Sequence, residues 1–284
     1  MTLDTTPLGP DFGARITGVR LVDALDEASF EEIRVALDTF SVLVLPDQPM
    51  TDDEQIAVGE RFGPLETTIS ANPARGTVFA RQSNIDMASG DLIGAEDRRM
   101  NYQKANMFWH ADSTFKTVPS LCSLLSAREV PPEGGATEFV STRTVYDELP
   151  PDRQAELDDL VVEHSLVYSR GLAGFTFTEE EAAETPPVRH RLVQTNPVNG
   201  LKSLMIGAHA SHIVGWPLEE GRALLADLLA RATDPERCYR HEWRQGDMVI
   251  WDNRASLHRA TPFDAGRHRR LMQRLTVSSG EAAA

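Results

Sequence analysis

The sequence predicts a mainly β protein with flanking helices, of the α+β class, and three observations support this. From Phe108 onward, short runs with strand-like composition outnumber helical patterns. Clusters of turn residues, such as "PPEGG", "NPVNG" and "RQGD", separate these runs. Helical periodicity is confined to a few segments. Many short strands with few helices are typical of a closed or double-sheet antiparallel barrel, and a jelly roll is the architecture that this pattern favours.

A strand, a helix and a second strand are predicted first. Residues 13–21 ("GARITGVRL") alternate with the period of a strand. Residues 26–40 are predicted as a helix, because an acidic first turn is followed by apolar side chains at helical spacing, namely Phe30, Ile33, Leu37 and Phe40. Residues 41–47 ("SVLVLPD") form a continuous apolar run that is typical of a buried strand, and Pro46 stops it.

A second helix and a long connection are predicted next. Thr51 with Glu54 three residues later has the form of a capping box, and Gly63 suits a helix C-terminus. Residues 66–104 then lack apolar periodicity and are rich in Gly, Asn, Asp and Ser. This composition predicts a long surface loop, which is either a lid over a binding site or a flexible insertion.

Eight strand-like runs and one amphipathic helix are predicted beyond Phe108. The helix covers residues 217–233 ("PLEEGRALLADLLARAT"), which have the apolar spacing of a helix with one buried face. The runs are "SLCSLLSARE", "ATEFVS", "DLVVEHSLVYS", "HRLVQTN", "KSLMIG", "CYRHEW", "DMVIWD" and "RRLMQRLTV".

Length and composition exclude several classes of protein. The 284 residues are predicted to form one elaborated domain, residues 1–284, with the long loop at about 66–104. The formal net charge of -15 argues against nucleic-acid or anionic-membrane binding, because phosphate surfaces attract basic faces. No apolar run is long enough to span a membrane. Two cysteines, Cys122 and Cys238, are too few for a disulfide scaffold, so we expect reduced thiols and a cytoplasmic location.

His110 and Asp112 are the first candidate metal ligands, in "FWHADSTF". On a strand, side chains two residues apart point to the same face, so both would project together. The pair alone proves little, because 8 histidines and 43 acidic residues supply such spacings by chance. One further histidine would complete the two-histidine, one-carboxylate triad of non-heme Fe(II) oxygenases, which leaves open coordination positions.

His258 is the best third candidate, because it follows the buried run "DMVIWD" and a polar turn. Arg270 and Arg274 lie beyond it in an otherwise apolar strand. Side chains four apart on a strand share a face and lie roughly 13 Å apart, so two inward arginines imply two bound anions. An iron site with a dicarboxylate co-substrate and an anionic substrate would supply both. The residues of opposite parity are expected to face outward: Arg267, Arg269 and Gln273.

Four segments resemble the Fe(II)/2-oxoglutarate-dependent dioxygenases of the taurine dioxygenase and 2,4-dichlorophenoxyacetate dioxygenase (TauD/TfdA) family. They are "WHADSTF", "PPEGGATEF", "VIWDNRASLHRATPFD" and "RRLMQRLTV". Segments "GARITGVRL" and "SVLVLPDQPMTDDEQIAVGERFGPLE" are similar to the N-terminal region of that family, and the likeness is weakest across residues 67–100. "HSLVYSR" and "SLMIGAHASHIVGW" look most like the branch that cleaves aryloxyalkanoate ethers.

The resemblance implies a double-stranded β-helix (jelly-roll) core and assigns residues to an iron site. His110, Asp112 and His258 match the Fe(II) ligands. Thr137 and Arg270 match positions that bind the co-substrate 2-oxoglutarate, with the arginine on its distal carboxylate. Molecular oxygen is the second co-substrate that the family uses.

The resemblance also implies a substrate site and a reaction. Arg274 matches the arginine that holds the anion of carboxylate or sulfonate substrates, and Asn106 matches a position that contacts substrate. The expected reaction hydroxylates a small anionic substrate and releases succinate and CO₂, and ether cleavage of an aryloxyalkanoate to a phenol and a 2-oxo acid is the variant favoured. Taurine, alkylsulfonates, alkyl sulfates and biosynthetic substrates are the alternatives within the family. A homo-oligomer is expected from the resemblance as well.

Two hypotheses from other classes remain open on the residues alone. Two histidines and a carboxylate with an open position also describe a catalytic zinc, as in a hydrolase. An anion-binding jelly roll without metal or catalysis is the second. Both leave the pair Arg270 and Arg274 less well explained than an iron site does.

The remaining histidines receive ordinary structural interpretations. His209 and His212 are spaced for a helical turn, and His209 is one candidate for the rim of a substrate pocket. The others are expected at the surface or in hydrogen bonds: His164, His190, His241 and His268. Trp109 and Trp251 are expected to pack beside the metal site.

Overall fold

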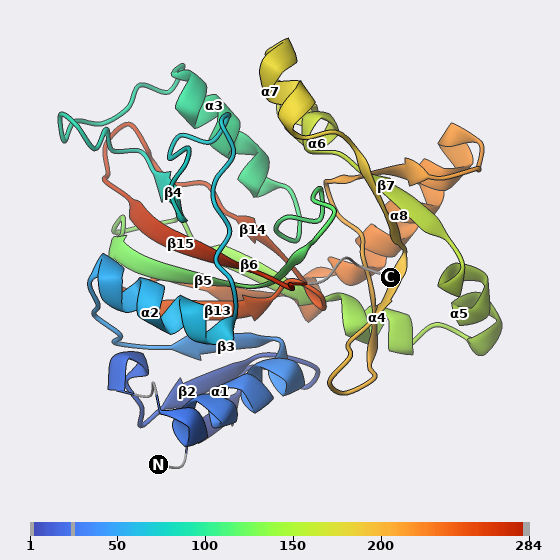
Figure 1. The fold of residues 1–284 in the computed structure, drawn as a ribbon, viewed down its shortest axis with the longest axis horizontal. Helices are drawn as coiled ribbons and strands as arrows, with labels where there is room; N and C mark the ends of the chain where they lie inside the picture. The colour runs from blue at the N-terminus through green and yellow to red at the C-terminus, as the bar shows by residue number, and fades with distance from the viewer. Residues whose placement is uncertain (1–2, 24–25, 281–284) are drawn as a thin grey trace.

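The computed structural model describes residues 3–23 and 26–280, and its centre is a large sheet covered on both faces (Figure 1). Two N-terminal helices, α1 and α2, lie on one face of this sheet. A smaller sheet packs against the other face. Further helices and short sheets form a second region, which packs against Val140 and Leu257 of the small sheet. The described residues therefore combine sheets and helices, as the α+β prediction requires.

The N-terminal third contributes both helices of the covering layer and four strands. The elements are β1 (Asp4–Pro7), β2 (Ala14–Thr17), η1 (Leu21–Asp23), α1 (Glu27–Phe40), β3 (Val42–Leu45), α2 (Asp52–Phe62), β4 (Phe79–Ser83), α3 (Arg98–Lys104) and η2 (Ala105–Met107).

The rest of the chain contributes most of the strands. The elements are β5 (Ser120–Glu129), β6 (Thr137–Ser141), α4 (Thr142–Asp147), α5 (Pro151–Asp158), β7 (Val161–His164), α6 (Leu166–Leu172), α7 (Glu179–Glu184), β8 (Val188–Arg191), β9 (Val193–Thr195), β10 (Lys202–Leu204), β11 (Ala210–Ile213), α8 (Leu218–Ala232), η3 (Pro235–Arg237), β12 (Tyr239–His241), β13 (Met248–Asp252), β14 (Ser256–Ala260) and β15 (Leu271–Ser278).

The described strands form one large sheet of order β1-β2-β3-β13-β5-β15-β4, a smaller one of order β12-β6-β14, and two further short sheets, β10-β9 and β11-β7-β8. Every neighbouring pair in them is antiparallel except β2 with β3. Successive side chains of a strand point to opposite faces of the sheet. On β3, Leu43 and Leu45 therefore pack under the helices, whereas Val42 and Val44 pack toward the small sheet. Burial of both faces explains why β3 and β13 read as continuous apolar runs.

The predicted capping box at the start of α2 is confirmed, and α1 has an N-cap that was not predicted. The Thr51 side chain accepts a hydrogen bond from the backbone N–H of Glu54, and the Glu54 carboxylate accepts one from Thr51. Asp26 caps α1 by accepting from the N–H of Ser29. Local sequence was sufficient here, because each cap satisfies backbone donors within one turn.

Two predictions of local structure were wrong. The run 159–169 is not one strand: β7 ends at His164, and Ser165 then caps α6 by accepting from the N–H of Tyr168. The segment 66–104 is not a bare loop, because it contains α3 and also β4, which is the edge strand of the large sheet beside β15. Helices α4 and α5 were also not predicted.

Two further findings concern the whole described chain. Among its helices, none is long and apolar enough to cross a membrane. Cys122 is buried, Cys238 is half-buried, and both are free thiols.

Candidate metal centre and anion pocket

His110 and His258 pair with each other in an isolated antiparallel β-bridge. The backbone N–H of His110 donates to the carbonyl of His258 at 3.0 Å, and the reverse bond measures 2.9 Å. Their ring centroids lie 4.3 Å apart. His258 belongs to β14, but His110 forms only an isolated bridge. The prediction that His110 and Asp112 share a strand was therefore wrong, although the two side chains do come together.

Asp112 reaches the same point from a turn that two other elements hold in place. Its backbone N–H donates to Asn253 Oδ1, and its carbonyl accepts from Ser120 Oγ. Its carboxylate accepts from Ser123 Oγ at 2.7 Å. One ligand atom from each of His110, Asp112 and His258 lies within 4.8 Å of the others, and all three residues are buried.

The protonation of the two histidines suits a metal. Burial lowers the pKa of His110 to about 4, and it lowers that of His258 well below its ordinary value, so both rings are neutral near pH 7. His110 Nδ1 lies 2.7 Å from the carbonyl of Phe108, which leaves Nε2 as the free lone pair. Among the described residues, neither ring nitrogen of His258 has a hydrogen-bond partner. Orphaned, buried imidazole nitrogens beside a carboxylate fit a divalent cation.

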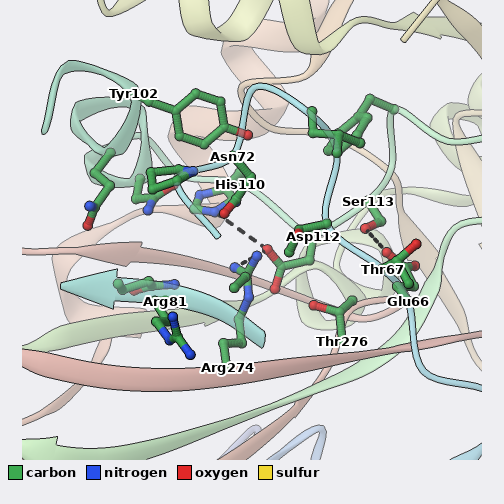
Figure 2. A pocket seen from close by; sticks show the side chains of 18 of the residues that line it. Glu66, Thr67, Asn72, Arg81, Tyr102, His110, Asp112, Ser113, Arg274 and Thr276 are labelled. Atoms are coloured by element: carbon green, nitrogen blue, oxygen red, sulfur yellow. Dashed lines mark hydrogen bonds and ion pairs between the residues drawn. The ribbon is translucent and has the colours of Figure 1, made fainter. Parts of the chain in front are cut away.

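The Asp112 carboxylate stays ionised in spite of its burial. Desolvation alone would raise its pKa, but the Arg274 guanidinium, with a hydrogen bond from Ser123, holds that pKa below its ordinary value. Arg274 Nη1 donates to Asp112 Oδ1 at 2.5 Å. Figure 2 shows the Arg274 side chain rising from β15 toward this carboxylate. The sequence predicted an inward Arg274, but it did not predict this bond.

Arg270 is a buried cation without a protein anion. It is 5 % exposed, and burial lowers its pKa to about 10. Its guanidinium makes only long hydrogen bonds to the carbonyls of Gln82 and Gly135, at 3.4 and 3.3 Å, and it forms no ion pair within the described ranges. Gly135 has φ +68, and a Cβ there would lie 3.2 Å from Arg270 Nε, so glycine permits this close approach. A buried guanidinium in this state is suited to an incoming carboxylate.

Thr137 starts β6 just beyond Gly135. It is buried, and its hydroxyl accepts a hydrogen bond from Trp243 Nε1 at 2.9 Å. In the pairing of β6 with β14, Thr137 lies opposite Ala260 and Phe139 lies opposite His258. Thr137 is therefore two residues away, along the paired strands, from the candidate ligand His258. Arg270 thus contacts Gly135, and Thr137 lies only two residues further along the chain.

The predicted outward orientation held for two of three residues. Arg267 and Arg269 are exposed, and Arg269 pairs with Glu129. Gln273 does point away from Arg274, but it is only 4 % exposed, because α2 covers that face and Asp52 accepts its side-chain N–H. Strand parity predicted its direction but not the helix above it.

The pocket beside His110 and Asp112 is lined by the segment 66–82 and by residues of α3, η2, α6 and β15. In Figure 2, Tyr102 and Arg274 lie on opposite sides of His110. Glu66 closes one edge, since its carboxylate accepts from Ser113 Oγ and from Lys116 Nζ, both at 2.6 Å. Part of the segment 66–104 therefore forms the pocket wall.

Asn106 and Arg170 meet inside this pocket. Asn106 Oδ1 accepts from Arg170 Nη1 at 3.1 Å, and the Arg170 guanidinium carbon lies 4.4 Å from the ring centroid of Tyr102. Sequence reasoning singled out Asn106 but missed Arg170. The one available signal was the arginine of "HSLVYSR", a segment that the sequence analysis used only for a family likeness.

His209 also lines the pocket, and its predicted helical turn was wrong. It precedes β11, and its ring centroid lies 6.0 Å from that of His110. The backbone before it passes close to the backbone of Trp109 and His110: a Cβ on Gly207, which has φ +111, would lie 3.0 Å from the Trp109 carbonyl. Trp251 packs beside His258, as expected, with ring centroids 4.6 Å apart. His164 departs most from its prediction, because it is fully buried and both its ring nitrogens lack partners among the described residues.

The chain resembles known proteins in both sequence and fold. The profile of the family described as "Taurine catabolism dioxygenase TauD, TfdA family" matches residues 4–276. The chain is 42 % identical over 283 residues to the alpha-ketoglutarate-dependent 2,4-dichlorophenoxyacetate dioxygenase of Cupriavidus pinatubonensis, covering 98 % of each chain. It is 39 % identical to the (S)-phenoxypropionate/alpha-ketoglutarate-dioxygenase of Sphingobium herbicidovorans, covering 92 % of this chain and 90 % of that one.

The fold has a close counterpart among solved structures. The crystal structure of AAD-2 in complex with Mn(II) and N-oxalylglycine superposes with a TM-score of 0.91 at 39 % sequence identity. The match covers 100 % of this chain and 99 % of the other.

Proposed function

This chain belongs to the TauD/TfdA family of 2-oxoglutarate-dependent dioxygenases, and on that premise we propose that it cleaves aryloxyalkanoates. It is an oxidoreductase that uses Fe(II), 2-oxoglutarate and O₂. The observation that carries the proposal is the full-length likeness to two phenoxyalkanoate dioxygenases, in a chain whose His110, Asp112 and His258 converge in one buried cluster.

The proposed iron ligands are His110, Asp112 and His258. Their donor set of two neutral imidazoles and one carboxylate is that of non-heme Fe(II) oxygenases. When bound, the iron with its co-substrate supplies the oxidation of a substrate C–H bond to C–OH, while one oxygen atom of O₂ enters succinate and CO₂ is released. The protein's part is to hold the carboxylate ionised and both rings neutral.

The proposed 2-oxoglutarate site uses Arg270 and Thr137. Arg270 is buried without an anion among the described residues, which supports a role on the distal carboxylate of the co-substrate. Thr137 has its hydroxyl oriented by Trp243, so that its O–H is free to donate to a carboxylate.

The proposed substrate site uses Arg274 and Asn106, which both line the pocket beside His110. Arg274 shares one amino group with Asp112, and its remaining N–H groups are available to a substrate carboxylate. Holding the carboxylate there aims the adjacent carbon at the metal. Hydroxylation of the carbon that bears an aryloxy oxygen gives a hemiacetal or hemiketal, which collapses to a phenol and a 2-oxo acid.

We further propose a jelly-roll core made by the large sheet and the β12-β6-β14 sheet. Its support is the layered packing together with the likeness to taurine-dioxygenase structures. The single domain over 1–284, the lid role of the segment 66–104, the homo-oligomer and the cytoplasmic location stay predictions. The zinc hydrolase and the non-enzymatic binding protein are set aside, because neither accounts for membership of a dioxygenase family.

Succinate formation tests the function. Purified protein is loaded anaerobically with Fe(II) and 2-oxoglutarate and exposed to O₂ with phenoxyacetate, each enantiomer of 2-phenoxypropionate, taurine or hexyl sulfate. The expected result is phenol release and succinate in equal amounts with a phenoxy acid, abolished in His110→Ala. The matched control is His212→Ala, which removes a half-buried histidine outside the cluster. Succinate stimulated only by taurine or hexyl sulfate would keep the chemistry and replace the substrate class.

A further inference from the structure

Arg170 and Arg270 are the two most buried arginines of the described chain, at 8 % and 5 % exposure. Neither forms an ion pair in the part of the chain that the structure describes. The proposed partner of Arg270 is a carboxylate of 2-oxoglutarate, whereas no proposed ligand pairs with Arg170. A buried guanidinium without an anion is unfavourable, so its retention requires a partner that arrives from outside.

The surroundings of Arg170 hold its guanidinium in one orientation. Asn106 Oδ1 accepts from Nη1, and the Tyr102 ring stacks against the guanidinium with its centroid 4.4 Å from the central carbon. Arg170 Nε is buried and has no hydrogen-bond partner among the described residues. The group is therefore positioned by an amide and a ring, neither of which neutralises its charge.

Arg170 lines the same pocket as Arg274 but comes from α6, whereas Arg274 comes from β15. The Arg274 charge is partly neutralised by its bond to Asp112. Of the cations that line the pocket, Arg170 is the most buried, and it forms no ion pair with a described residue. It lines the same pocket as His110 and Asp112, so an anion bound in that pocket would be attracted to it.

We propose that Arg170 directly contacts the anionic group of the substrate and makes the pocket selective for charged over uncharged aryl ethers. This inference rests on the proposed function, because it assigns a second anion contact in that same site. Asn106 then acts on substrate at least partly through Arg170, as a positioning residue. Replacement of Arg170 by an uncharged residue should weaken binding of a carboxylate and leave binding of its uncharged counterpart unchanged.

The experiment is calorimetric titration of anaerobic enzyme that carries Mn(II) and 2-oxoglutarate. The ligands are phenoxyacetate and uncharged 2-phenoxyethanol, and the variants are Arg170→Gln and Arg170→Lys. The control is Arg222→Gln, because Arg222 also stacks on a tyrosine of α6, at 5.3 Å from the Tyr168 centroid, but does not line the pocket.

The expected result is a Kd for phenoxyacetate raised about 10- to 100-fold in Arg170→Gln, the size of a lost hydrogen bond to a charged group. Arg170→Lys should recover part of this loss, and Arg222→Gln should match the wild type. The Kd for 2-phenoxyethanol should be the same in all four proteins. The thermal midpoint of ligand-free Arg170→Gln should not fall below that of the wild type, because an unpaired buried charge is removed.

Equal weakening of both ligands in Arg170→Gln would overturn the proposal, because Arg170 would then only shape the pocket. Unchanged phenoxyacetate binding would overturn it as well. If wild-type enzyme binds hexyl sulfate or taurine but not phenoxyacetate, the aryloxyalkanoate function fails separately, and the same variants are compared on the anion that does bind. An enzyme that binds none of these anions overturns the proposal.

Discussion

Arg274 and Asp112 are joined by a hydrogen bond of 2.5 Å, so one carboxylate links the proposed iron to the proposed substrate arginine. The other carboxylate oxygen accepts from Ser123. Arg274 therefore has two effects on the same site: its charge keeps Asp112 ionised, and its free N–H groups face the pocket. Positioning of a metal ligand and recognition of an anion are coupled through a single side chain.

Replacement of Arg274 should consequently affect two ligands. Arg274→Ala is expected to weaken Mn(II) about tenfold, because a group that orients a ligand carboxylate is lost, and to weaken phenoxyacetate as well. Arg274→Lys retains a cation and should restore metal affinity better than substrate affinity, since a lysine lacks the planar fork. Both constants come from calorimetry. A metal affinity that stays at the wild-type value in Arg274→Ala would show that the bond to Asp112 does not orient it.

Arg270 should control the co-substrate alone. Arg270→Ala is expected to raise the KM for 2-oxoglutarate by about 100-fold or more, because it removes a buried cation that pairs with a carboxylate. Arg269→Ala is the matched control: the adjacent arginine is exposed and bound to Glu129, so its loss should leave that KM unchanged. Initial rates of succinate release over a 2-oxoglutarate series provide the comparison. Similar KM values in the two variants would remove Arg270 from the co-substrate site.

Ser123 and Asn253 form a support for Asp112. Asn253 Nδ2 donates to Ser123 Oγ, which in turn donates to the Asp112 carboxylate, and Asn253 Oδ1 accepts from Trp251 Nε1. Ser123→Ala should weaken metal binding about 10- to 100-fold, the usual effect of losing an outer partner of a ligand. The control is Ser126→Ala, another buried serine of β5. Equal metal affinities in the two variants, measured with Mn(II), would contradict the support role.

The sequence predicted what local chemistry or alternation decides. The Thr51 cap depends on residues one turn apart, and the buried strands depend on continuous apolar runs. The proposed ligands, His110, Asp112 and His258, were chosen from spacing, composition and a family likeness, and the structure brings them together. In contrast, the bridge that sets His110 against His258 joins distant segments, and no local pattern encodes it.

Arg170 escaped prediction for a related reason. "SLVYS" has strand-forming residues, yet Leu166 is fully buried against other elements and Ser165 caps a helix there. Tertiary packing overrode the local preference, as it does when a short helix is stabilised by its buried face. The same holds for Gln273, whose burial depends on α2, an element far away in the chain.

An ion cluster behind the site should be important for stability. Arg254 binds Asp38 at 2.6 Å and Asp252 at 2.8 Å, and both carboxylates are buried. Arg254→Met leaves two buried carboxylates unpaired and should lower the free energy of unfolding by about 3–5 kcal/mol. Arg231→Met removes an exposed pair with Asp227 and should cost under about 1 kcal/mol. Urea denaturation gives both values, and comparable losses would show that burial adds nothing to the cluster.

His164 predicts a pH dependence of stability that is separate from the metal site. Burial, with a smaller contribution from His190, lowers the pKa of His164 to about 3, and the unfolded chain has the ordinary value near 6.5. As pH falls below about 6.5, the unfolded state takes up a proton that the folded state refuses, so stability decreases by up to about 1.4 kcal/mol per pH unit. His190 and His209 are the other titratable groups nearby, and their pKa values are also lowered. Between pH 8 and pH 5, the free energy of unfolding of His164→Leu should therefore rise by about 2 kcal/mol relative to that of the wild type, as measured by urea denaturation. At pH 8, the difference in free energy of unfolding between the variant and the wild type measures packing alone. If that difference were the same at pH 5, His164 would accept a proton in the folded protein.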